Sequence, residues 1–97
     1  MKSSKLIRDN VQEENSTALS GEEYVNAVLN QISTTALNIK TKTEAEDVLC
    51  EVSDILELIN SYLSTQNLKP GDLMDTASKL RNELGTFSKK LSVQDKE

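Results

Sequence analysis

One apolar run, residues 48–63, constrains most strongly what this chain of 97 residues can fold into. Its apolar side chains recur every three or four positions, which predicts a helix that continues to about Thr65. They cover more than one narrow stripe, so this central helix has to be packed against on more than one side. The chain holds only two Tyr and one Phe. We therefore expect a core made of aliphatic side chains.

Two further helices are predicted on either side of the central one. Residues 20–23 (Ser-Gly-Glu-Glu) have the capping-box pattern that satisfies free backbone N–H groups at a helix start, and residues 43–46 (Thr-Glu-Ala-Glu) repeat it before the central helix. Pro70 suits the first turn of a third helix, and Gly85 suits the residue after its end. The predicted fold class is therefore all-α, with three main helices.

The length and the two end segments bound the architecture. At 97 residues the chain forms one domain at most. Residues 1–19 are expected to be irregular apart from one helical turn within residues 7–11. Residues 86–97 are expected to be a tail whose Phe87 and Leu91 are able to dock on the helices. Three helices leave the central one overexposed in a monomer. We therefore expect a homo-oligomer, a helical bundle built from several chains.

Composition argues against several classes of function. The formal net charge of -5 argues against nucleic acid as the main partner, and the absence of His removes the commonest general base and His-based zinc sites. No stretch reaches the roughly 20 apolar residues that span a bilayer, and the start of the chain has no apolar signal core. We therefore expect a cytoplasmic protein without a membrane partner. Cys50, in the apolar run, is expected to be a small buried hydrophobe.

Two acidic residues of the central helix form the first candidate site. Glu51 and Asp54 are three positions apart, so a helix places them side by side. Paired carboxylates supply the oxygen ligands that Mg²⁺ and Mn²⁺ prefer. The pattern is consistent with a weak metal site, with a solvated acidic face or with an acidic face that lines an interface. Asp47 and Glu57, about one turn to either side, are expected to be solvated charges.

Three further segments carry a resemblance to a known family. They are residues 5–11 (KLIRDNV), 51–59 (EVSDILELI) and 81–91 (RNELGTFSKKL), which occur in this order along nearly the whole chain. Together they resemble the MazG-like, phosphoribosyl-ATP pyrophosphohydrolase-like superfamily of all-α proteins. The resemblance implies an oligomeric bundle that hydrolyses a nucleotide to its monophosphate and pyrophosphate. It also implies Mg²⁺ held by an ExxE pair on one helix and an ExxD pair on the next, the second of which matches Glu51 and Asp54.

The chain departs from this family at the ExxE pair. In the register of the family, the two glutamates fall on Gln31 and Thr34, which keep oxygen atoms but carry no charge. Because Mg²⁺ gives up its bound waters reluctantly, the loss of two charges out of four implies a weak or vestigial Mg²⁺ site. Gln31 and Thr34 are then either an ordinary polar helix face or residues that recognise a nucleotide through hydrogen bonds.

Basic residues near both ends are candidate phosphate ligands. Lys5, Arg8 and Lys89 are either ordinary surface charges or contacts to phosphate groups, a role that suits the planar guanidinium of Arg. The leading hypothesis is a catalytically impaired relative of Mg-dependent nucleotide pyrophosphohydrolases that binds or sequesters a nucleotide or a nucleotide-like molecule. The alternatives are an active pyrophosphohydrolase with a reduced site and a structural protein-interaction module.

Overall fold

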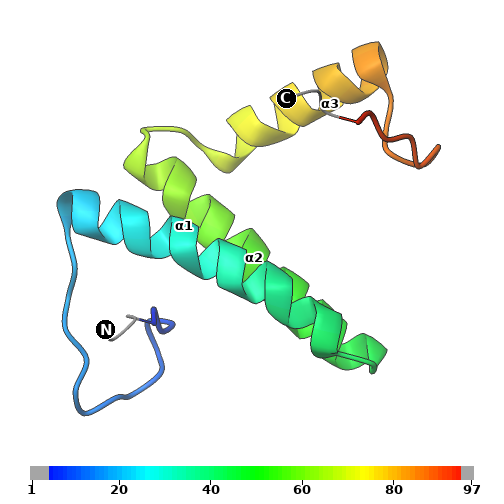
Figure 1. The fold of residues 1–97 in the computed structure, drawn as a ribbon. Helices are drawn as coiled ribbons and strands as arrows, with labels where there is room; N and C mark the ends of the chain where they lie inside the picture. Colours follow the sequence, from blue (N-terminus) through cyan, green and yellow to red (C-terminus); the bar gives the residue numbers. More distant parts are fainter. Residues whose placement is uncertain (1–4, 95–97) are drawn as a thin grey trace.

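The computed structural model describes residues 5–94, and every regular element among them is helical. In chain order these are α1 (Gly21–Asn38), a short 3-10 helix η1 (Ile39–Thr41), α2 (Ala45–Thr65) and α3 (Pro70–Leu84). Helices α1 and α2 lie side by side as an antiparallel layer, and α3 turns away from the end of α2 (Figure 1). The all-α prediction is thus confirmed for the described residues. None of the helices among these residues is long and apolar enough to cross a membrane.

The helix boundaries agree with the prediction to within about one residue, but the two expected capping boxes do not form. Ser20 precedes α1 and Glu44 precedes α2, and neither side chain makes a hydrogen bond to its helix start. Gly21, the first residue of α1, has a φ of 59° instead of the negative φ of a regular helix. The N–H groups of the first turn are therefore not oriented toward the Ser20 hydroxyl. Helix α2 begins one residue later than expected, which puts Glu44 rather than Thr43 at the cap position.

The start and the end of α3 follow the prediction. Pro70 is its first residue, and the Asp72 carboxylate accepts a hydrogen bond of 2.8 Å from the backbone N–H of Lys69. A negative side chain in the first turn also interacts favourably with the positive end of the helix. After Leu84 the chain leaves the helix through Gly85, whose φ of 87° is readily adopted only by glycine.

The core is small and lies between α1 and α2. Val28 is completely buried, and Leu63 is 9% exposed. Thr35, on the same side of α1 as Val28, is also buried. The expectation of an aliphatic core is confirmed for the described residues, but this core covers only one side of α2.

Much of the apolar surface of α2 is therefore left uncovered. Leu49, Val52 and Leu56 are 66%, 47% and 56% exposed. Their spacing of three and four residues places them on one face of the helix. The expectation that a single chain leaves its central helix overexposed is confirmed.

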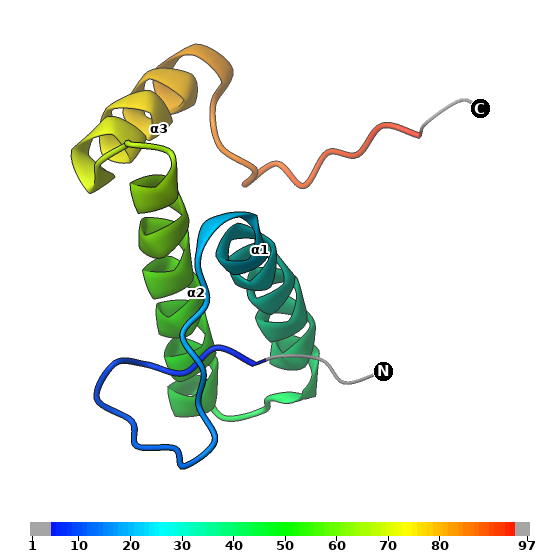
Figure 2. The ribbon, with the colours of Figure 1, turned by 90° about the vertical axis from the view of Figure 1, so that its left-hand side faces the viewer.

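Two expectations about burial are wrong. Cys50 is an exposed free thiol, because it lies about 200° around α2 from the half-buried Val48, on the side turned away from α1. Phe87 and Leu91 are 97% and 83% exposed, so they do not dock on the helices. The reason is that residues 86–94 form a tail without regular structure that extends away from the helices (Figure 2).

Residues 5–20 pass over one side of the α1–α2 layer without forming a helix (Figure 2). In place of the expected helical turn there is a single non-helical turn, in which the N–H of Val11 donates to the carbonyl of Arg8 at 3.0 Å. The backbone N–H of Leu6 donates to the side-chain oxygen of Gln31 at 3.4 Å. This N-terminal segment is thereby attached to α1.

Candidate functional site

The N-terminal segment and the α1–α2 layer together form a groove with a volume of about 810 Å³. Its lining includes Lys5 and Arg8 from the segment, Tyr24 and Gln31 from α1, and Asp54 from α2. A volume of this size lies within the range found for small-molecule binding sites. The groove is therefore the candidate functional site of the described chain.

An ion pair joins the two walls of this groove. The Nη2 and Nε atoms of Arg8 both donate to Oδ1 of Asp54, at 2.6 and 3.2 Å. This hydrogen bond first, and then the charge of Asp54, raise the pKa of Arg8 above its ordinary value, so Arg8 stays charged. Both side chains are about half exposed, so water screens the pair and its main effect is to position the segment.

The positioning role of this pair can be tested by proteolysis. Asp54→Asn is expected to speed trypsin cleavage after Arg8 several-fold, because the N-terminal segment then loses a charged attachment to α2. The cleavage rate is read by mass spectrometry of the released peptide. Glu57→Gln, which removes a charge from the same groove without breaking the ion pair, is the matched control and is expected to leave the rate unchanged. Equal cleavage rates in both variants and the parent protein would show that the ion pair does not position the N-terminal segment.

Glu51 has a different cationic partner. The Nζ of Lys42 lies 3.8 Å from Oε2 of Glu51, and Glu51 is not part of the groove lining. Each of the two carboxylates predicted to share a metal is thus matched by its own cation. Within residues 5–94, no three or more His, Cys, Asp or Glu side chains are grouped to hold a metal ion. A pair of carboxylates with cationic neighbours attracts a divalent ion only weakly.

Two of the residues predicted to contact a ligand lie outside the groove. Thr34 is exposed, because the N-terminal segment covers α1 at Gln31 but not one turn further along. Lys89 is exposed on the tail that follows α3, and α3 turns away from the α1–α2 layer (Figure 1). The remaining three, Lys5, Arg8 and Gln31, are brought together.

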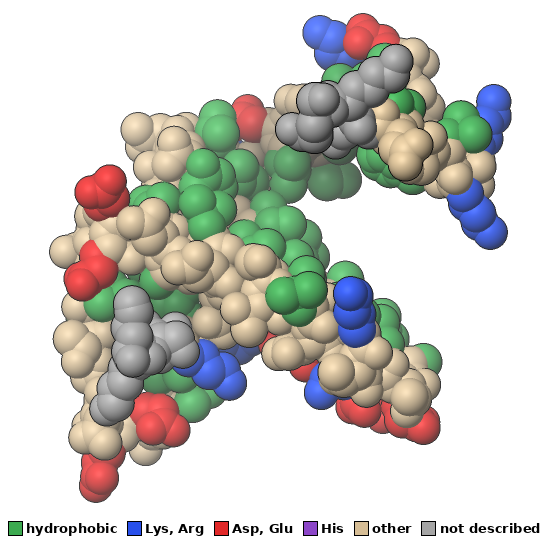
Figure 3. All heavy atoms as spheres, in the orientation of Figure 1, with side chains coloured by type: hydrophobic (Ala, Val, Ile, Leu, Met, Phe, Trp, Pro, Cys, Tyr) green, Lys and Arg blue, Asp and Glu red, His purple; other side chains and the backbone are tan. Residues whose placement is uncertain are grey.

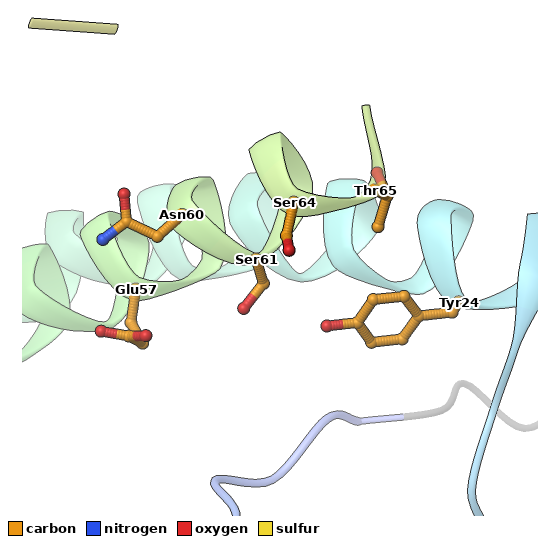
Figure 4. Close-up of a pocket in the computed structure, with 6 residues that line it drawn as sticks. All are labelled: Tyr24, Glu57, Asn60, Ser61, Ser64 and Thr65. Carbon is orange, nitrogen blue, oxygen red and sulfur yellow. The ribbon is translucent and has the colours of Figure 1, made fainter. Parts of the chain in front are cut away.

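A second, smaller hollow of about 410 Å³ adjoins the groove at Tyr24. The Tyr24 side chain reaches from α1 toward the α2 side chains, with its hydroxyl group directed at the position of Ser61 (Figure 4). Tyr24, Glu57 and Ser61 line both hollows. None of the three was predicted to be a site residue. Glu57 was expected to be a solvated charge, and helical spacing alone does not distinguish Tyr24 from Tyr62 as the aromatic side chain that lines a cavity.

Comparisons with protein-family models, with curated proteins and with solved structures give no match for this chain. Among the described residues, the fold and the site define an all-α protein with a groove of mixed polar and apolar lining under its N-terminal segment. The likeness to MazG-like proteins depends on the three sequence segments alone.

Proposed function

We propose that this chain is a cytoplasmic homo-oligomer that binds a nucleotide or a nucleotide-like molecule in the groove, as a catalytically impaired relative of the MazG-like pyrophosphohydrolases. One observation carries the proposal. Lys5, Arg8 and Gln31, each singled out from the sequence as a ligand contact, line a single groove of about 810 Å³ although they come from separate segments. A volume of this size accommodates a nucleotide.

The two basic side chains suit the phosphate groups of such a ligand. Arg8 uses Nε and one N–H of Nη2 for Asp54, and a guanidinium carries five N–H donors in a planar fork. Its other donors can therefore meet a phosphate while the bond to Asp54 keeps the guanidinium in place. Lys5 adds a second positive charge on the same wall. Charge-assisted hydrogen bonds of this kind are stronger than neutral ones.

The neutral side chains suit the base of the nucleotide. Gln31 uses its side-chain oxygen for Leu6, so its amide N–H groups are the donors that it offers to the groove. Tyr24, at the junction of the two hollows, provides an aromatic surface for stacking. The groove lining thus combines two cationic side chains and the carboxylates of Asp9, Asp54 and Glu57 with neutral hydrogen-bonding and aromatic groups.

The same residues favour binding over hydrolysis. Cleavage of a phosphoanhydride depends on metal ions that neutralise the developing charge and orient water. Glu51 and Asp54 are the remaining acidic pair, and each is already matched by a cation. The proposal therefore includes a weak or vestigial Mg²⁺ site at Glu51 and Asp54, but no hydrolysis of the bound nucleotide.

Thermal shift with a panel of nucleotides, with and without Mg²⁺, tests the proposal. A ligand that binds only the folded state raises Tm. For the best nucleotide, Arg8→Ala is expected to weaken binding by about 10- to 100-fold, the usual loss when a charged hydrogen bond is removed. Arg81→Ala, an equivalent change on the exposed surface of α3, is the control and is expected to leave the shift unchanged.

Two outcomes would overturn the proposal in different ways. A flat response across the whole panel would leave the protein-interaction module as the better reading. Release of pyrophosphate from a nucleoside triphosphate at an enzyme-like rate, in Mg²⁺ or Mn²⁺, would identify an active hydrolase instead.

A further inference from the structure

The second hollow, of about 410 Å³, has a lining of a different kind from that of the groove. Each of its six lining residues carries a hydroxyl, amide or carboxylate group, and none of them is Lys or Arg. They are Tyr24, Glu57, Asn60, Ser61, Ser64 and Thr65. The lining is therefore polar and carries negative charge from one side chain.

This lining argues against three classes of ligand. Glu57 repels an anion and no cation of the lining attracts one, so a phosphate group does not suit the hollow. One carboxylate supplies too few charged oxygen atoms to hold a divalent cation firmly. Apolar side chains gather instead between α3 and the α1–α2 layer (Figure 3), so an apolar ligand has no matching surface here. A neutral ligand rich in hydrogen-bonding groups fits best.

One face of α2 supplies most of these polar groups. At 100° per residue, four of them lie within an arc of about 100° over two turns of the helix, namely Glu57, Asn60, Ser61 and Ser64. The half-buried Tyr24 reaches toward this face from α1, with its hydroxyl group directed at the position of Ser61 (Figure 4). Polar groups from two helices therefore converge on the hollow.

Most of the hydrogen-bonding capacity of this lining is unused within the described chain. The Thr65 hydroxyl is engaged, since it donates to the carbonyl of Tyr62 at 2.6 Å and accepts from the Gln66 amide at 3.2 Å. The other five lining side chains take part in no side-chain hydrogen bond or ion pair within residues 5–94. They can therefore turn their donors and acceptors toward a ligand.

A sugar has the chemistry that matches these groups. The Glu57 carboxylate only accepts hydrogen bonds, and its two oxygen atoms can accept from two neighbouring hydroxyl groups of a sugar at once. Hydrogen bonds to such a charged acceptor are stronger than neutral ones. The hydroxyl of Ser61 and the amide of Asn60 also donate, so they can serve the other oxygen atoms of the sugar. The volume lies near the lower end of the range for small-molecule sites, which suits a single sugar ring.

We propose that the second hollow binds the neighbouring hydroxyl groups of a single sugar, with Glu57 as the principal acceptor. Glu57, Ser61 and Tyr24 also line the groove. The sugar therefore has two sources, the ribose of a nucleotide held in the groove or a free sugar. The first source rests on the proposed function, and the second does not.

A pair of nucleotides tests the ribose source. Isothermal titration of the full chain compares the best ribonucleotide of the thermal-shift panel with its 2′,3′-dideoxy counterpart. The dideoxy nucleotide is expected to bind about tenfold more weakly, because it lacks both hydroxyl groups that donate to Glu57. Glu57→Ala is expected to abolish this difference, and the ratio of the two affinities cancels any effect of the lost charge on the phosphates. Glu83→Ala, an exposed charge of α3, is the control and is expected to keep the difference.

Saturation-transfer NMR with free ribose, without nucleotide, tests the second source. A ribose signal that Glu57→Ala removes would identify a free sugar as the ligand. Ser61→Ala is a second variant and is expected to weaken whichever sugar contact is found by a few-fold, the usual loss of one neutral hydrogen bond. Ser53→Ala, at an exposed position of α2 that lines neither hollow, is its matched control and is expected to have no effect.

Equal affinities for the two nucleotides, together with no ribose signal, would overturn the sugar site and leave nucleotide binding in the groove intact. A nucleotide difference or a ribose signal that Glu57→Ala leaves unchanged would overturn it too, because the sugar would then bind elsewhere. A flat nucleotide panel would overturn the proposed function instead. In that case a ribose signal that depends on Glu57 would still support the sugar site, and its absence would overturn both.

Discussion

Val28→Asp is expected to abolish the cooperative thermal unfolding transition of this protein. Val28 is the one side chain among residues 5–94 that is completely buried, and it lies where α1 packs on α2. A carboxylate at this position has no cationic partner, and an unpaired buried charge costs several kcal/mol. Since the whole stability of a small domain is about 5–15 kcal/mol, the change removes most of it. Circular dichroism against temperature, at a fixed protein concentration, measures the transition.

A conservative pair of variants makes the same prediction quantitative. Val28→Ala is expected to lower the free energy of unfolding by about 2 kcal/mol, through the lost apolar contact and the cavity that it leaves. Leu37 lies on the same helix and is 60% exposed. The change Leu37→Ala is therefore expected to alter the free energy of unfolding by less than about 0.5 kcal/mol. Similar effects of the two truncations would contradict the packing of α1 on α2.

Gln31→Glu is expected to raise the affinity for Mn²⁺ by at least about tenfold, because the number of charged oxygen ligands sets the affinity of such a site. The change adds a carboxylate to the groove lining, which already includes those of Asp9, Asp54 and Glu57. The backbone N–H of Leu6 keeps an oxygen acceptor at this position, so the fold is expected to be retained. Electron paramagnetic resonance of free Mn²⁺ measures the binding.

Thr34→Glu is the matched control for this charge. It adds the same group one turn further along α1, at an exposed position outside the groove, and is expected to leave Mn²⁺ affinity unchanged. An equal gain from both variants would show that the groove is not the centre of the site. It would favour instead the register in which the family places a metal ligand at both positions.

Local sequence patterns predicted the helices well, because they depend on residues close together in the chain. The periodicity of residues 48–63 predicted α2, and Pro70 and Gly85 marked the bounds of α3. Local patterns were less reliable for side chains. Cys50 was predicted to be buried from its place in an apolar run, but its side of α2 faces away from α1. Periodicity identifies an apolar helix face and does not say which neighbour covers it.

For the candidate site, the sequence alone indicated the residue types and the tertiary structure decided their partners. The uncharged side chains of Gln31 and Thr34 could be read directly from the sequence, as could the acidic pair Glu51 and Asp54. Arg8 forms an ion pair with Asp54, which lies 46 positions away in the chain. This contact depends on how the irregular N-terminal segment passes over the α1–α2 layer. A segment without periodic structure carries no local signal for its path, since its position is set by a few contacts made only after the helices have packed.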